Sequence, residues 1–492
     1  MTASASAPAA APDHPRFAVG VLAFCGVVVA IMQTIVVPLL PHIPELTGAT
    51  PAAASWLVTV TLLTGAVFTP VLGRVGDMYG KRRVLVASLG VLVVGSVLCA
   101  VSSHIGVLIA GRALQGAAIA VVPLGISILR DELPPERVLS AVALMSSTLG
   151  IGAAVGLPVA AVVIENFEWH AMFWVSAVIG LLDIVLVFRC VPESPFRSRG
   201  RFDALGALGL TGALVCLLLA VTQGGGWGWT STRTLGLFVA SVVIGLVWGA
   251  YELRVRTPMV DLRVSARPAV LLTNVAALLI GFAFYANSLV TGQMVQEPKA
   301  TGYGLGASLI VSGLCLLPSG VAMVALSPVS ARISAKHGPK TSLALAAVII
   351  VVGYVVRYFT SHALWTIIAG ATVVAAGTAI AYSALPALVM RGVPVSETGA
   401  ANGLNTLMRS VGQAFCSATV AAVLANMTFL AAGRPAPTLG AYQLVFLIAA
   451  GAALLALAVT LCLPGGGAAE GTVGRKNRSS GRTRAMPIQG GA

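Results

Sequence analysis

The residues between positions 73 and 83 are those in this chain best suited to chemistry. They include Gly73, Arg74, Asp77, Gly80 and three consecutive basic residues, although only 9% of the chain is charged. A carboxylate among arginines and lysines can form charge-assisted hydrogen bonds. The glycines let two helices approach closely and let the backbone reverse. The stretch therefore predicts a short, charged, tightly turning loop between two apolar segments.

A second polar group lies within an apolar segment, where Arg112 is followed by Gln115 and Gly116. An arginine at membrane depth is costly unless it faces a polar cavity or a partner. It could then hydrogen-bond a ligand or modulate a carboxylate. The alternative is an arginine that snorkels toward the outer interface.

Asp183 is the only acidic residue clearly inside a predicted helix. A buried carboxyl group can exchange a proton if its access to the two sides of a membrane alternates. The alternative is a packing residue that is protonated or locally paired. No paired carboxylates, metal-ligand spacing or nucleophile with a base occur at membrane depth, so the sequence predicts neither an enzyme nor a metal or cofactor site.

The composition excludes an ordinary soluble protein. The chain has 492 residues, 57% of them hydrophobic, with 54 glycines and a mean hydropathy of +0.94. Its formal charge of +14 is divided among many short loops, which indicates membrane topology rather than nucleic-acid binding. The expected fold is an all-α polytopic membrane protein whose surroundings are a lipid bilayer.

Fourteen apolar segments approach the roughly 20 residues needed to cross a bilayer core. A helix count that is even places both termini on one side, and 24 of the 30 basic residues then fall on that side, which the positive-inside rule makes cytoplasmic. The predicted segments are 17–40, 54–72, 84–101, 105–129, 138–164, 171–191, 204–221, 235–251, 269–290, 305–329, 343–359, 364–390, 400–430 and 442–463.

An internal repeat relates the two ends of the chain. Residues 70–80 and 328–338 share Pro, Val, Arg and Gly in one register, 258 residues apart, which indicates two similar halves. The predicted organisation is a disordered cytoplasmic N-terminus (1–16), a six-helix half (17–191), cytoplasmic linkers with an inserted helix pair (192–268), a second six-helix half (269–463) and a disordered basic tail (464–492). The tail cations could rest on anionic lipid or be solvated.

Residues 73–83 closely resemble the cytoplasmic signature of the major facilitator superfamily, which places it between the second and third helices. The matching residues are Gly73, Asp77, Gly80, Lys81 and Arg82. The segment 105–129 also resembles that family, through the arginine followed by Gln-Gly. The resemblance implies two bundles that rock about a central passage, with Asp77, Arg74 and Arg130 joining the halves at the cytoplasmic face.

The segment 138–164 carries a row of small residues followed by a proline: Gly150, Gly152, Gly156 and Pro158. Such a row permits close helix packing and a bend. It is similar to the antiporter signature of the superfamily, although Leu157 separates the last glycine from the proline. Together with loop strings elsewhere, it makes the chain resemble the fourteen-helix drug and proton antiporter branch; generic close packing is the alternative.

One departure affects the chemistry of coupling. That branch usually carries an aspartate in its first helix, whereas this chain has Met32 at the matching position. With Arg112 and Arg409 inside helices, we expect neutral or weakly anionic substrates rather than dications. The polar residues expected to line a substrate cavity amid apolar side chains are Gln33, Thr34, Trp56, Asn274, Tyr285, Asn287 and Asn405, alongside Arg409.

The resulting hypothesis is a monomeric exporter of drug-like or secondary-metabolite compounds in a bacterial cytoplasmic (inner) membrane. Alternating access would be driven by the proton gradient, without a bound cofactor. One alternative is an uncoupled or symport facilitator of a small metabolite. Another, from a different class, is a membrane sensor or scaffold that transports nothing.

Overall fold

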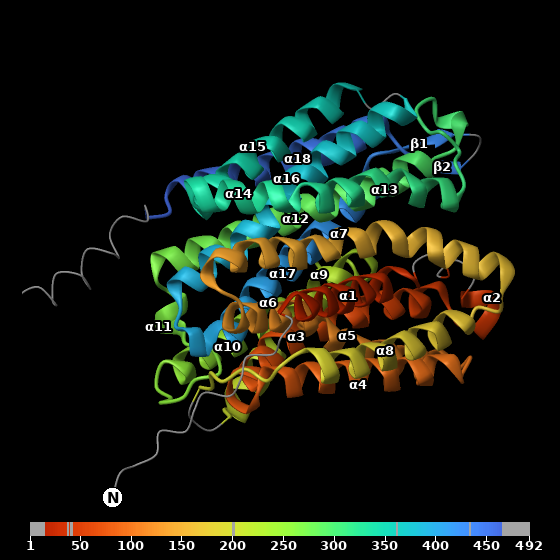
Figure 1. Ribbon diagram of the computed structural model, residues 1–492. Helices are drawn as coiled ribbons and strands as arrows, with labels where there is room; N and C mark the ends of the chain where they lie inside the picture. Colours follow the sequence, from red (N-terminus) through yellow and green to blue (C-terminus); the bar gives the residue numbers. More distant parts are fainter. Residues whose placement is uncertain are drawn as a thin grey trace, which may run out of the picture.

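The computed structural model describes residues 15–36, 39, 43–198, 202–360, 363–431 and 434–464. Long helices run side by side along a common direction and form one bundle (Figure 1). The first helix group consists of α1 (Pro15–Thr34), α2 (Ile43–Thr47), α3 (Pro51–Tyr79), α4 (Lys81–Ala100), α5 (Ile105–Gly116), the 3₁₀ helix η2 (Ala117–Ala120), α6 (Val121–Glu132), α7 (Pro135–Asn166) and α8 (Ala171–Cys190).

An inserted pair, α9 (Ala204–Trp227) and α10 (Thr232–Glu252), follows, and then the short helix α11 (Leu262–Ser265). The second helix group comprises α12 (Pro268–Gln296), η3 (Lys299–Thr301), α13 (Leu309–Ala325), α14 (Ser327–His337), α15 (Pro339–Thr360), α16 (Leu364–Gly392), η4 (Val395–Glu397), α17 (Thr398–Asn426) and α18 (Leu439–Leu461). The strands β1 (Thr428–Ala431) and β2 (Arg434–Pro437) form an antiparallel hairpin between the last two helices.

The predicted fourteen-helix membrane fold is confirmed. Thirteen helical spans in the described part of the chain are long and apolar enough to cross a membrane, with α5, η2 and α6 forming one crossing and α13 and α14 another. Helix α7, with 32 residues, completes the series. Its length exceeds the roughly 20 residues that a bilayer core requires.

Most helices extend beyond their predicted apolar segments, and at the start of several of them a polar side chain caps a first-turn backbone N–H group. Thr50 shows how this works at the start of α3. Its side chain accepts a hydrogen bond from the Ala53 N–H, and Pro51 occupies the first turn, where no N–H is needed. Apolar composition alone therefore located the middle of each helix better than its ends.

Two predicted local structures are wrong. Residues 73–83 are not a loop: α3 continues to Tyr79 and α4 begins at Lys81, so that Gly80 alone separates them, with a φ of 118°. A glycine in this conformation reverses the chain within one residue. The segment 400–430 is not one continuous helix either, because α17 ends at Asn426 and β1 follows.

Arg357, near the end of the predicted segment 343–359, is fully buried in α15. Its guanidinium donates a hydrogen bond to the Asn287 side chain and lies 4.5 Å from the centroid of the Phe446 ring. The helix continues to Thr360, so that this arginine faces helices α12 and α18 rather than water.

Each helix group has its own apolar core. Buried residues of α12, α15, α16 and α18 form one cluster, and buried residues of α1, α4, α6 and α7 form another. Helix α9 packs Leu210, Leu214 and Leu218 against α3 and α17, and it carries α10 on its other side. The predicted division into two halves, 17–191 and 269–463, with the insert 192–268 stays a prediction.

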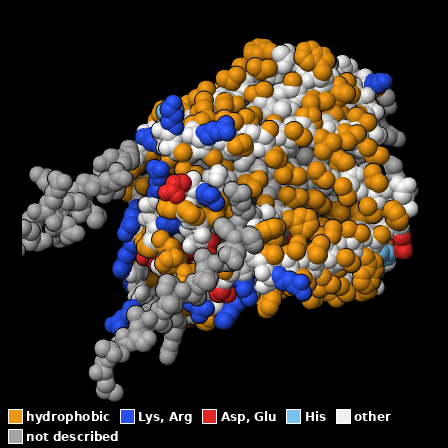
Figure 2. Space-filling view, in the orientation of Figure 1, with side chains coloured by type: hydrophobic (Ala, Val, Ile, Leu, Met, Phe, Trp, Pro, Cys, Tyr) orange, Lys and Arg blue, Asp and Glu red, His pale blue; other side chains and the backbone are white. Residues whose placement is uncertain are grey.

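Three helices of the first group, α3, α6 and α7, contact the second group. Helix α7 packs against α13 and α16, while α3 and α6 pack against α17. The face of the bundle seen in Figure 2 is mainly hydrophobic, whereas lysines and arginines gather at the end where Figure 1 labels α10 and α11. We call this the gate end. The greater part of both predicted disordered ends, residues 1–14 and 465–492, lies outside the described residues.

Candidate functional site

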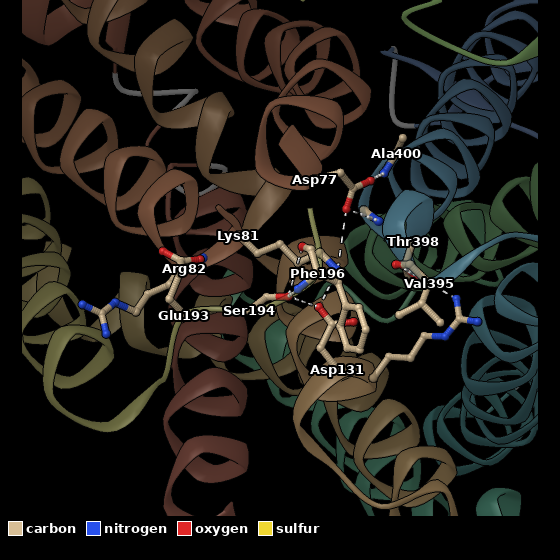
Figure 3. A network of polar contacts seen from close by, with 12 residues as sticks. Asp77, Lys81, Arg82, Asp131, Glu193, Ser194, Phe196, Val395, Thr398 and Ala400 are labelled. Atoms are coloured by element: carbon tan, nitrogen blue, oxygen red, sulfur yellow. Dashed lines mark hydrogen bonds and ion pairs between the residues drawn. The ribbon is translucent and has the colours of Figure 1, made fainter. Parts of the chain in front are cut away.

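Asp77 connects the two helix groups at the gate end. Its carboxylate is fully buried and accepts hydrogen bonds from the backbone N–H groups of Gly399 (3.0 Å) and Ala400 (2.8 Å). These are N–H groups of the first turn of α17, which have no partner within their own helix. An aspartate on α3 thus occupies the positive end of a helix in the other group (Figure 3).

Backbone contact makes this connection possible. A Cβ atom at Gly73 would lie 2.5 Å from the Gly399 carbonyl oxygen, and one at Gly403 would lie 2.8 Å from the Thr69 carbonyl oxygen. Neither position leaves room for a side chain while α3 and α17 touch. The glycine at position 73 therefore serves helix approach rather than a loop.

Arg130 makes a second link between the groups. It extends from the last turn of α6, and its Nη1 donates to the Thr398 hydroxyl of α17 at 2.7 Å. Lys81 stays within the first group: its Nζ lies 2.6 Å from Asp131 and 3.6 Å from Asp77. The resemblance predicted that Asp77 and Arg130 meet at one junction. The structure places both at the gate end, where each bonds to the first turn of α17.

The chain after α8 is fastened to the same junction, which the sequence did not predict. The Glu193 carboxylate accepts from the Arg82 N–H at 3.1 Å, and the Ser194 hydroxyl bonds to Asp131. The Ser198 N–H donates to the Asp77 carbonyl at 2.7 Å. Figure 3 shows this segment beside Lys81 and Asp131. The sequence carried one signal for this attachment, because Glu193 is an acidic residue among strongly basic loops.

Arg112 holds three helices together. Its Nε donates to the Leu57 carbonyl of α3 at 3.1 Å, and its Nη1 donates to the Met32 carbonyl of α1 at 2.9 Å and to Gln115 at 2.7 Å. Only 1% of the arginine is exposed. Gln115 in turn donates to Ser96 of α4 at 2.8 Å. Neither the outward-snorkelling alternative nor a place in the central cavity fits this position.

The small residues of the Arg112 motif and of α7 set helix spacing. A Cβ atom at Gly116 would lie 2.0 Å from the Thr64 hydroxyl of α3. On α7, the glycine at 152 meets Ala30 and that at 156 meets Thr34, both on α1, whereas Gly150 meets Met323 of α13. The row therefore packs α7 against both groups. Pro158 lies within α7, two residues after the last glycine of the row.

A cavity of about 160 Å³, the central cavity, lies between the two groups. It includes four predicted residues: Gln33 and Thr34 on α1, Tyr285 on α12 and Arg409 on α17. It also includes polar residues that the sequence did not single out. The remaining lining consists of Ala30, Leu62, Ile119, Leu149, Phe284, Ser288, Tyr382, Thr406, Ser410 and Gln413.

Arg409 is the only charged side chain among the described residues lining the central cavity. It is 5% exposed, donates to Thr406 at 3.0 Å and lies 4.6 Å from the centroid of the Tyr382 ring. The spacing of Thr406, Arg409, Ser410 and Gln413 places four polar residues on one face of α17. That helical spacing could have identified the missed residues.

Other predicted candidates lie elsewhere. Asn405 donates to Asn274 at 3.1 Å and ties α17 to α12, and Asn287 bonds to Arg357 and to the Ala371 carbonyl. Trp56 is not among the described residues lining the central cavity.

Asp183 is fully buried between α8 and α1, beside Cys25, and is likewise absent from that lining. Its carboxyl oxygens lie beside the Cys25 thiol and accept no N–H or O–H hydrogen bond from the described residues. The structure therefore separates this carboxyl group from the central cavity.

A fourteen-span bundle with a hydrogen-bonded junction at one end and a cavity between two helix groups defines a class: polytopic membrane proteins built like transporters. The sequence profile of the Major Facilitator Superfamily matches residues 22–417. The chain belongs to that superfamily.

Curated relatives support this membership. An uncharacterized MFS-type transporter of Mycobacterium tuberculosis strain H37Rv is 29% identical over 86% of the chain, which spans 61% of that relative's length. The Multidrug resistance protein Stp of the same organism is 27% identical (75% of this chain and 68% of that one). The Tetracenomycin C resistance and export protein of Streptomyces glaucescens is also 27% identical, over 67% of this chain and 59% of that one.

A solved structure shares the fold. The human organic anion transporter MFSD10 (TETRAN) superposes with a TM-score of 0.66, covering 91% of this chain and 100% of that one. The two sequences are 17% identical. This likeness concerns the arrangement of helices alone.

Proposed function

We propose that this protein exports amphiphilic drug-like or secondary-metabolite molecules across a bacterial cytoplasmic membrane by alternating access. It acts as a monomer, with both termini in the cytoplasm and with proton entry as the driving force. The observation that carries the proposal is the gate-end junction, where Asp77 bonds to the first turn of α17 beneath a cavity shared by both groups. The names of two relatives, a multidrug resistance protein and an export protein, agree with it.

The gate residues would make the two groups separable. Asp77 and Arg130 contribute hydrogen bonds across the junction only while α17 lies against α3 and α6. The glycines at 73 and 399 add no interlocking side chains, so that the helices could part without threading past one another. Opening this end would connect the central cavity to the cytoplasm. The basic residues around it support the cytoplasmic assignment.

The lining of the central cavity favours a neutral or weakly anionic amphiphile. Aromatic and aliphatic side chains surround the ligand space, while Arg409, Gln33, Gln413 and Tyr382 provide a few polar anchors. Apolar contact with a small number of placed polar groups is typical of ligand cavities. A dication would have to lie beside a guanidinium with no carboxylate among the described lining residues to compensate it.

The site of proton coupling is Asp77 or Asp183 in this proposal, since both are buried and neither lies in the central cavity. Asp77 would respond to opening of the junction, whereas Asp183 would require a path through the first group. The absence of any carboxylate from the described cavity lining favours one second candidate, an uncoupled facilitator of a small metabolite.

Accumulation of a fluorescent anionic amphiphile in cells with and without the protein tests the proposal. We expect lower accumulation in cells that contain it, and a return to the control level when a protonophore collapses the gradient. Ethidium serves as the cationic comparison and should be exported less. Equal accumulation in both cell types would overturn export, and extrusion that survives the protonophore would overturn proton coupling and support the facilitator.

A further inference from the structure

A second cavity, the basic pocket, lies at the gate end and is separate from the central cavity. Its volume is about 290 Å³, and the two cavities share no lining residue. The charged residues that line the basic pocket are Arg74, Arg197, Arg256, Asp261 and Glu397.

The three arginines come from separate parts of the chain. Arg74 comes from α3 of the first group, Arg197 from the segment after α8, and Arg256 from the segment between α10 and α11. The first turn of α17 supplies Ala400 and Ala401. The pocket therefore exists in this form only while α17 lies against α3, as it does when Asp77 holds their junction closed.

Arg74 gives the pocket a buried cation without a direct ion-pair or hydrogen-bond partner among the described residues. Only 8% of this residue is exposed, and within the described residues it has neither an ion pair within 4.0 Å nor a hydrogen bond from its side chain. Asp77 is near enough to interact with its charge, but that carboxylate bonds directly to backbone N–H groups of α17 and is also shared with Lys81 at 3.6 Å. A buried charge without a partner is costly, so a bound anion would remove a penalty.

The two carboxylates of the pocket do not fill that role. One oxygen of Asp261 accepts the N–H groups of Arg263 (2.9 Å) and Val264 (3.1 Å) and so caps α11. Glu397 also lies in the lining, yet no arginine of the pocket is within ion-pair distance of either group in the described residues. The lining carries three guanidinium groups against two carboxylates, which leaves one positive charge to be balanced.

We propose that the basic pocket binds a phosphate-bearing anion. The guanidinium fork matches phosphate oxygens with parallel hydrogen bonds, and three arginines line this pocket. The pocket lies at the end of the bundle where the basic residues gather, at the level expected for phospholipid headgroups. The phosphate could belong to an anionic lipid headgroup or to a soluble ion, and both sources offer the same chemistry.

Binding has a consequence for the gate. An anion held by Arg74, Arg197 and Arg256 joins α3 to the segments that flank the inserted pair, against the first turn of α17. It therefore stabilises the closed gate end and not an open one. This gives the inserted pair and its flanking segments a part in setting how readily the gate opens.

Binding to the purified full-length protein tests this inference, whatever the transport substrate. In one arm, inorganic phosphate is added in detergent at constant ionic strength, with chloride as the comparison, and Tm is measured. In the other, native mass spectrometry counts phosphatidylglycerol retained after exposure to mixed phosphatidylglycerol and phosphatidylcholine micelles. The variants are Arg256→Gln and Arg197→Gln, both exposed positions, and the matched control is Arg254→Gln, which is exposed but does not line the pocket.

We expect the wild-type protein and the Arg254 control to bind, and each pocket variant to bind about tenfold more weakly, as the loss of one charge-assisted bond implies. A phosphate-dependent rise in Tm identifies a soluble ion, and selective retention of phosphatidylglycerol identifies a lipid. No binding in either arm, or an equal loss in the Arg254 control, would overturn the inference. Because both readouts measure binding, a failure of the export proposal would leave them unaffected.

Discussion

Replacement of Asp77 by asparagine should weaken the closed state of the gate. The carboxylate accepts two backbone N–H groups of α17, at 3.0 and 2.8 Å, in a fully buried position. Asparagine has one acceptor oxygen and an NH₂ group that would face the second N–H. The loss of one charge-assisted hydrogen bond is worth about 1.5–3 kcal/mol, which shifts an equilibrium between closed and open forms roughly 10- to 150-fold.

The assay compares transport with the width of the gate end. Spin labels at Tyr79 on α3 and Val395 in η4 occupy exposed positions on either side of the junction. In Asp77→Asn we expect normal amounts of protein in the membrane, a longer and broader distance distribution between the labels, and impaired export.

Asp203→Asn is the matched control for this variant. It carries the same substitution in a carboxylate that also accepts a backbone N–H group, that of Gly206 at 2.8 Å, but it caps its own helix, α9, and joins no two groups. A wild-type distance distribution together with wild-type export in Asp77→Asn would refute the gate reasoning. An equal effect of the control would show that general damage at this end, not the junction, is responsible.

Three further predictions concern other contacts. Arg112→Gln should destabilise the protein by about 1–3 kcal/mol for each of the two carbonyls, one on α1 and one on α3, that lose their donor; thermal unfolding in detergent measures this, and an unchanged Tm would contradict the structural role. Gly73→Ala should hinder closure and reduce export, since its Cβ would lie 2.5 Å from the Gly399 carbonyl oxygen. Gly90→Ala is the control and should export normally, because its Cβ would have no neighbour within 4 Å. Equal export by both variants would count against the close approach of α3 and α17. Arg409→Gln should lower the affinity for an anionic amphiphile about tenfold and change that for a neutral one little; fluorescence titration distinguishes these results, and equal losses would remove its role in charge selection.

The sequence predicted the number of spans because a bilayer imposes a length and a composition on each one. It also predicted, through the family resemblance, that Asp77 and Arg130 belong to one site, although they are 53 positions apart in sequence; both bond to the first turn of α17. Resemblance supplied this pairing, since charge and periodicity alone do not say which helices meet.

Other features depend on packing that composition does not encode. Arg357 and Asn287 each look like surface or cavity residues when taken singly, but they bury one another between α15 and α12. Tyr382 lies in a long apolar helix, and only the position of Arg409 on a neighbouring helix marks it as part of the central cavity. Such relations appear only when two helices are placed side by side.

The attachment of the segment after α8 was predictable in part. Glu193 is an acid among basic residues, and Arg82 is the kind of partner it needs. The backbone bond from Ser198 to the Asp77 carbonyl carries no side-chain signal and could not have been inferred.

The distance between labels at Tyr79 and Val395 in the otherwise unchanged protein, reconstituted in lipid, tests the central claim most directly. Alternating access predicts two distance populations, the shorter matching the closed junction, with proportions that change when a transported amphiphile or a pH difference is applied. A single short distance that no ligand or gradient alters, in protein that still exports, would contradict the account.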